Sequence, residues 1–104
     1  MYVVAGFNGD NVFVDTVYKT EAEAEKAWSL IVADYFIQAG ILKPDEYQRI
    51  WQHPKMDTCK KVMRRKKNMK VDENSLTYIL DNQVMFSVCV VPVYMAEEKT
   101  ETAC

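Results

Sequence analysis

The chain has 104 residues, 49% of them hydrophobic and 12% aromatic, and its formal net charge is −2. A length of this order is typical of a single domain, which can bury enough apolar surface to fold without disulfides. The sequence pI is about 5.4. Dedicated DNA-binding domains usually have a basic pI, above about 9, so the overall composition argues against that class.

Cysteine usage and the first residues point to a reducing compartment. The three cysteines, Cys59, Cys89 and Cys104, are odd in number and widely spaced, which makes a poor disulfide framework. The opening "MYVVAGF" lacks the basic region of a secretory signal, and no apolar run reaches the ~18 residues that span a bilayer. We therefore expect a cytoplasmic protein without membrane contact.

Residues 2–18 predict a β-hairpin. The Asn-Gly pair at positions 8 and 9 suits a two-residue type I′ turn, in which both central residues need a positive φ. That turn sets the expected cross-strand pairs: Val3 with Val14, and Ala5 with Val12.

Residues 20–39 predict a long amphipathic helix. Thr20 and Glu23 have the spacing of a capping box, and Gly40 suits the end of a helix. The apolar residues that follow helical spacing form the expected buried stripe: Ala24, Ala27, Trp28, Ile31 and Tyr35. Over residues 28–37 the apolar surface is wider than one sheet needs, so either later helices or a partner must cover the rest.

Two short helices are expected next. Pro44, followed by two acids, suits the first turn of a helix that ends near Pro54. Asp57 or Thr58 would cap another helix, which carries the basic segment 59–67. Three residues of that helix share a narrow apolar face: Cys59, Val62 and Met63.

Residues 75–94 predict a second hairpin with a three-residue loop at 81–83. The expected pairs are Leu80 with Val84, Tyr78 with Phe86, and Leu76 with Val88. The sequence thus predicts an α+β fold, with a four-stranded antiparallel sheet from two β-hairpins and one long and two short helices between them. Residues 1–94 would form a single domain, and residues 95–104 a flexible acidic C-terminal tail.

Catalytic and metal-binding patterns are missing from the sequence. The lone histidine, His53, precedes a proline, and the cysteines lack paired ligand spacing. The three glycines do not have the spacing of a phosphate-binding loop. Asp15 and Asp34 interrupt apolar segments, but we expect Asp15 at an exposed edge and Asp34 either in solvent or paired with Arg49. Bases around Cys59 would lower the pKa of its thiol. We expect no enzyme, metal or cofactor.

The charge distribution marks a candidate binding segment. Residues 55–70 contain eight Lys or Arg and one Asp, whereas the rest of the chain contains five bases and fourteen acids. The candidate binding residues lie on the expected basic helix: Lys60, Lys61, Arg64, Arg65 and Lys67. Three interpretations stay open: a solvated helix face, contact with an acidic protein surface (including that of a second copy in a homodimer), or contact with nucleic-acid phosphates.

A protein partner is favoured among these interpretations. Reading a single strand would need exposed aromatics beside the bases, and we expect the nearest, Trp51 and Tyr78, to be buried. The hairpin "GDNVFVDTVY" followed by a capped helix resembles, in layout, many small proteins of phages and mobile elements. Because no catalytic pattern is found, we expect a binding or inhibitory protein. The resemblance implies that its target is nucleic-acid-handling machinery, for example as an anti-CRISPR-type inhibitor. The alternative is a direct, sequence-nonspecific nucleic-acid-binding protein that uses the basic helix 59–67.

Overall fold

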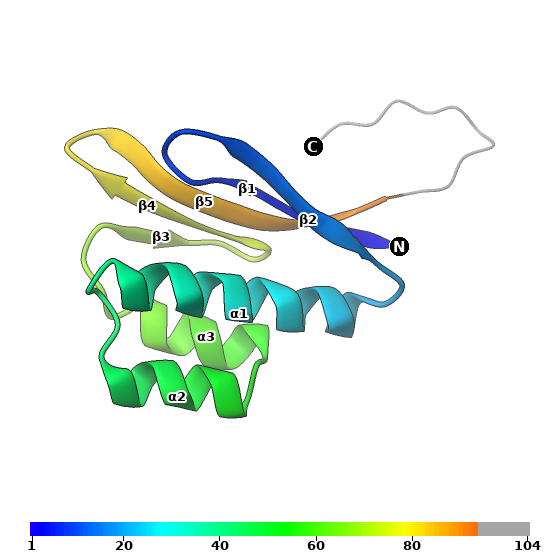
Figure 1. The fold of residues 1–104 in the computed structure, drawn as a ribbon, viewed down its shortest axis with the longest axis horizontal. Helices are drawn as coiled ribbons and strands as arrows, with labels where there is room; N and C mark the ends of the chain where they lie inside the picture. The colour runs from blue at the N-terminus through cyan, green and yellow to red at the C-terminus, as the bar shows by residue number, and fades with distance from the viewer. Residues whose placement is uncertain (94–104) are drawn as a thin grey trace.

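The computed structural model describes residues 1–93, which form one antiparallel five-stranded sheet and three helices (Figure 1). The elements in chain order are β1 (Tyr2–Phe7), β2 (Val12–Tyr18), α1 (Glu21–Gln38), α2 (Pro44–Gln52), α3 (Met56–Met63), β3 (Met69–Val71), β4 (Ser75–Leu80) and β5 (Gln83–Pro92). The strand order is β2-β1-β5-β4-β3, so the first and last strands pair at the centre. The predicted α+β fold is confirmed, and the predicted tail at 95–104 lies outside the described residues.

The four-strand prediction is wrong because it misses β3. This strand pairs with β4 through Met69 opposite Tyr78 and Val71 opposite Leu76. Asn68, at a φ of 64°, reverses the chain before it. The sequence of β3 alternates apolar and polar side chains over only three residues, which is too short a pattern to predict a strand. Its extended conformation is decided by pairing with β4.

The first hairpin forms, but its register differs from the expected one. Phe7 lies opposite Val12 and Ala5 opposite Val14, because the connection has four residues instead of two. In that connection the backbone N–H of Asn11 donates to Oδ1 of Asn8 at 3.2 Å. Only the glycine of the Asn-Gly pair has a positive φ, 99°, so a type I′ turn is not formed.

The second hairpin follows the expected register in its body and departs from it at the turn. Tyr78 pairs with Phe86, and Leu76 with Val88, as predicted. Leu80 pairs with Gln83, so the loop has two residues. Its residues, Asp81 and Asn82, both have positive φ, at 55° and 64°, as a type I′ turn requires. An irregularity after Tyr78 absorbs the one-residue difference.

Helix α1 packs directly on the sheet. The predicted capping box is present: Thr20 Oγ1 accepts from the Glu23 N–H, and Glu23 Oε1 accepts from the Thr20 N–H. Trp28 is fully buried, as predicted, among residues of the sheet and the helices. On the sheet side the core includes Val4, Leu76, Phe86, Val88 and Val90.

Helices α2 and α3 pack on α1, on the side of the molecule where α1 lies (Figure 1). Ile50 of α2 and Met63 of α3 are fully buried. Of the two alternatives for the wide apolar surface at residues 28–37, the later helices cover most of it. The three helices therefore form layers on one face of the sheet, and the opposite face carries no helix of the described chain.

Candidate functional site

The basic segment is only partly helical. Helix α3 spans Met56–Met63, so it begins and ends earlier than the predicted helix over 59–67. The N-cap residue of α3 is Lys55, and no side chain forms a capping hydrogen bond there. The prediction that Asp57 or Thr58 caps this helix is therefore wrong. After Met63 the chain makes tight turns, with the N–H groups of Arg65 and Lys66 bonded to the carbonyl oxygens of Val62 and Met63. The bases at 64–67 are thus presented by a turn.

Lys60 is separated from the other predicted binding residues. It is only 8% exposed, and its ammonium donates to the backbone carbonyl of Glu73, just before β4. A buried ammonium that is already hydrogen-bonded to the backbone serves to join α3 to the sheet. The structure leaves Lys61, Arg64, Arg65 and Lys67 as exposed members of the predicted set.

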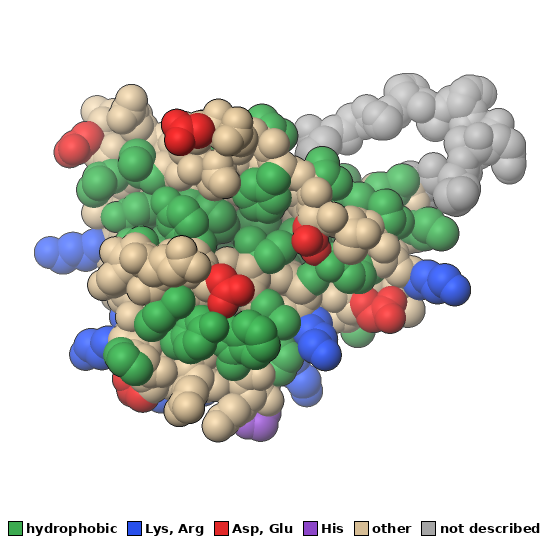
Figure 2. All heavy atoms as spheres, in the orientation of Figure 1, with side chains coloured by type: hydrophobic (Ala, Val, Ile, Leu, Met, Phe, Trp, Pro, Cys, Tyr) green, Lys and Arg blue, Asp and Glu red, His purple; other side chains and the backbone are tan. Residues whose placement is uncertain are grey.

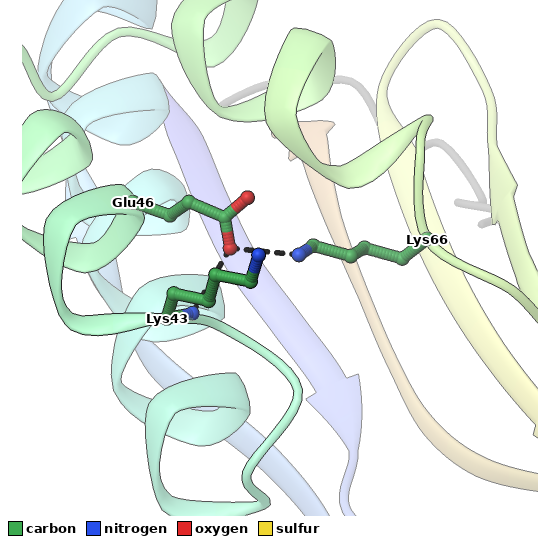
Figure 3. A network of polar contacts seen from close by, with 3 residues as sticks. All are labelled: Lys43, Glu46 and Lys66. Atoms are coloured by element: carbon green, nitrogen blue, oxygen red, sulfur yellow. Dashed lines mark hydrogen bonds and ion pairs between the residues drawn. The ribbon is translucent and has the colours of Figure 1, made fainter.

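Lys66, in the turn after α3, reaches back to α2. Its Nζ lies 2.7 Å from Oε1 of Glu46, and the two form the single ion pair found among residues 1–93. The same oxygen accepts the backbone N–H of Lys43 at 2.9 Å (Figure 3). Glu46 therefore fastens the turn after α3 to the first turn of α2.

A shallow groove lies between α2 and α3. It has a volume of about 280 Å³ and is lined by Glu46 and Arg49 of α2 and by Thr58, Lys61, Val62 and Arg65 on the other side. Residues 58, 61 and 65 follow the i, i+3, i+7 spacing of one helix face, although α3 itself ends before 65. We call this feature the basic groove.

Three cations converge on the basic groove, from Arg49, Lys61 and Arg65. None of them forms an ion pair with a described residue, because Glu46, the acid in the lining, is bonded to Lys66. The sequence prediction included Lys61 and Arg65 but missed Arg49 and Thr58. The spacing 58, 61, 65 was a signal for Thr58, whereas only the packing of α2 against α3 brings Arg49 to the same place.

The groove is suited to binding an anion more than to moving a proton. Partial burial alone would raise the pKa of Glu46, but the hydrogen bonds from Lys43 and Lys66 outweigh it and lower that pKa. Glu46 thus stays ionised at neutral pH and is a poor general acid. The remaining polar groups, two guanidinium groups, one ammonium and one hydroxyl, are donors to carboxylate or phosphate oxygens.

A second surface feature lies on α2 and α1, away from the groove. Oδ1 of Asp34 accepts from the Tyr47 hydroxyl at 2.9 Å and from the Trp51 indole N–H at 3.4 Å. Asp34 is exposed and forms no ion pair with Arg49. Trp51 is 44% exposed, so the prediction that Trp51 is buried is wrong. Figure 2 shows hydrophobic side chains gathered over α2, with basic side chains at the rim of this view.

The prediction that nearby bases lower the pKa of the Cys59 thiol is wrong. Its side chain is fully buried, and that burial raises the pKa of its thiol to about 12. The nearby bases do not reverse this effect. A thiol of this kind packs as a small hydrophobic group.

Comparisons with known proteins identify no relative. No family model matches the chain, and no match was found among curated proteins or solved structures. Within residues 1–93, no helix is long and apolar enough to cross a membrane, and no group of three or more His, Cys, Asp or Glu could hold a metal ion.

Proposed function

We propose that this chain is a non-enzymatic binding protein whose basic groove takes an acidic side chain or segment of a partner protein. The observation that carries the proposal is the convergence of Arg49, Lys61 and Arg65 without an ion-pair partner among the described residues. Folding holds three like charges together at this place, and an anionic ligand would relieve their repulsion. The two arginines can each bind a carboxylate through two parallel hydrogen bonds.

The dimensions of the groove favour a small anionic group. Pockets for cofactors and drug-sized ligands usually measure about 300–1,000 Å³. The basic groove, at about 280 Å³, is smaller and is open at the surface. A glutamate or aspartate side chain presented by a partner fits this description better than a nucleotide cofactor does.

Nucleic acid is the second candidate ligand, and the position of Trp51 disfavours it. Trp51 is exposed, but it follows Arg49 by two positions on α2, which places the two about 200° apart around the helix. The aromatic surface and the basic groove thus lie on different sides of α2. A single-stranded ligand would need its bases and its phosphates to meet both at once.

The narrower prediction, that the partner belongs to nucleic-acid-handling machinery and is inhibited, rests on the layout resemblance to phage proteins. An acidic body with one basic groove suits such a role, because the partner's basic nucleic-acid channel and its acidic residues would each meet a complementary surface. Flanking phage or defence genes would support this prediction, and flanking housekeeping genes would weigh against it.

The binding proposal is tested with a labelled oligoglutamate peptide and fluorescence anisotropy at low salt. We expect saturable binding by the wild type and loss of it in Lys61→Glu/Arg65→Glu. The matched control is Lys26→Glu/Lys70→Glu, which makes the same change in net charge at exposed positions outside the groove. If both double variants lose binding equally, the attraction is only long-range and the groove proposal fails.

A variant that gains function sharpens the test. Glu46→Gln removes the one acid in the groove lining and releases Lys66, so it should bind the oligoglutamate peptide more tightly than the wild type. Unchanged affinity in Glu46→Gln, together with unchanged affinity in Lys61→Glu/Arg65→Glu, would show that the groove is not where the peptide binds.

A further inference from the structure

The sheet is covered on one face only. Helices α1, α2 and α3 lie on the same side of it (Figure 1), and side chains of the central strands alternate between that covered face and the opposite one. Val4, Val88 and Val90 point to the helices and are buried. The residues between them in sequence belong to the other face, which we call the open face.

The open face is apolar over β2, β1 and the end of β5. The strand register places Val3 beside Val17 and Val91, and it places Ala5 beside Val14. The largest exposures among the hydrophobic side chains of the strands occur here: Val12 is 79% exposed, Val14 63% and Val17 52%. An exposed apolar group of this kind on a sheet usually marks an interaction surface.

Charge is nearly missing from the open face. Phe7, Ser87, Thr77 and Lys70 form one row across four strands, and Lys70 on the edge strand β3 is the charged member of that row. Asp15 of β2 turns to the other side, where it accepts a hydrogen bond from Tyr18, which packs against the core. A second copy of the same face can therefore approach without placing acids against acids.

The free edge of β2 is a poorer place for association. The register between β1 and β2 shifts between Val3 and Ala5, so β2 carries a bulge, and Asp15 lies within it. Bulges and charged side chains on an edge strand are devices that prevent addition of another strand. Stacking of faces is the arrangement that these features leave available.

The area suits a weak dimer. The five strands have three to ten residues each and lie about 4.8 Å apart, so they present a face of about 500 Å², and two copies would bury about 1,000 Å² in total. That value lies at the lower limit for a specific interface. We propose that a second copy of this chain covers the open face, so that two sheets stack with their helices outward.

Such a dimer would have a functional consequence. The basic grooves lie in the helical layer, so the two grooves of a dimer would face away from each other on opposite outer sides. Each could hold an acidic group independently, and a partner whose two acidic sites can reach both outer sides at once would gain affinity through the linkage. The dimer itself does not depend on the groove, so the two proposals can fail separately.

The experiment is sedimentation velocity of the full-length chain over a range from low to high micromolar concentration. We expect a monomer–dimer equilibrium, with the dissociation constant raised at least about tenfold in Val12→Lys/Val14→Lys, because the added charges would be desolvated at the interface. Both positions are exposed in the monomer, so the variant should keep the wild-type melting temperature at concentrations where the wild type is monomeric. The control is Trp51→Lys, which changes an exposed apolar residue on the helical side.

Each other outcome overturns the proposal. A monomer at all concentrations means that no second copy covers the open face. Loss of the dimer in Trp51→Lys alone would place the contact on the helices. New hydrogen-exchange protection of the outward-pointing β2 amide groups on dimerisation would indicate strand addition at the edge instead of stacking.

Discussion

The indole N–H of Trp28 donates a hydrogen bond of 3.1 Å to the carbonyl oxygen of Val88, a residue 60 positions later in the chain. Both residues are fully buried. The bond fixes α1 on the central strand β5 and satisfies the one polar atom of a large apolar side chain. Trp28 thus both fills the core and sets how the helix lies on the sheet.

Trp28→Ala should lower the free energy of unfolding by about 3–5 kcal/mol, because it leaves a cavity and removes the donor. Trp28→Phe keeps much of the volume and should cost less. The comparison is made by urea denaturation, with Trp51→Ala as the control at an exposed tryptophan, where a change below about 1 kcal/mol is expected. Equal losses in Trp28→Ala and Trp51→Ala would contradict this account of the core.

Cys59 should react very slowly with iodoacetamide while the protein is folded. The thiolate is the reacting species, and burial raises the pKa of this thiol to about 12 from a usual value of 9.0. At pH 8 the thiolate population should be roughly a thousandfold below that of an ordinary cysteine, as a three-unit shift implies. Peptide mapping by mass spectrometry, with and without urea, measures the rate. Labelling at the same rate in both conditions would show that Cys59 is accessible.

Tyr18 should ionise at unusually high pH. The hydrogen bond to Asp15 is the main cause that raises the pKa of Tyr18 to about 12, and partial burial adds to it. Since the folded-state pKa lies above the unfolded value of about 10, this contribution to stability is complete below pH 10 and is lost as the pH rises toward 12. The pKa of Tyr47 is also raised, mainly by its hydrogen bond to Asp34, so ultraviolet titration should show more than one late-ionising tyrosine. The Tyr18 component is the one that should move toward pH 10 in Asp15→Ala. An identical titration curve for the variant would contradict the role of Asp15.

The ion pair between Glu46 and Lys66 should make the stability of the fold depend on pH in the acid range. The pKa of Glu46 is lowered in the folded protein. The ionised side chain therefore contributes to stability above the unfolded-state pKa near 4.5, and this contribution is lost as the pH falls through the folded-state pKa. Glu46→Gln should be less stable than the wild type at pH 7, by no more than about 1 kcal/mol for a pair near the surface. Thermal melts at pH 7 and near pH 3 test this, and the two proteins should melt alike at the lower pH. A difference that persists there would assign the effect to packing.

Local signals predicted much of this fold. The capping box of Thr20 and Glu23 and the apolar stripe around Trp28 located α1 correctly, and Pro44 located the start of α2. These features act within one or two turns of a helix, so neighbouring residues suffice to determine them. The pairing of Tyr78 with Phe86 was likewise predictable from the alternation of apolar residues.

The errors occurred where distant contacts decide the structure. Strand β3 forms because β4 pairs with it, and the four-residue connection after Phe7 moves β2 by two residues relative to β1. The run of bases suggested a helix to residue 67, but α3 ends at Met63 and tight turns follow it, before Asn68 turns the chain back toward the sheet. The carbonyl oxygen of Glu73 that holds Lys60 belongs to a distant segment and could not be identified from neighbouring residues. Arg49 enters the groove only through helix packing.

The last prediction concerns nucleic acid, the competing ligand of the basic groove. If duplex DNA binds there, three cations from Arg49, Lys61 and Arg65, with one of the neighbouring exposed bases, should give a slope of log K against log salt of roughly −3 to −4. Affinity would then fall by about 60-fold to 250-fold between 50 and 200 mM salt, and no base sequence should be preferred. The acidic remainder of the chain repels the same polyanion, so we expect negligible binding at physiological salt. The measurement is an anisotropy titration of labelled duplexes at several salt concentrations, with Lys61→Glu/Arg65→Glu and its charge-matched control. Tight binding that survives physiological salt in the wild type and the control, and vanishes in Lys61→Glu/Arg65→Glu, would make nucleic acid the ligand of the groove in place of an acidic protein.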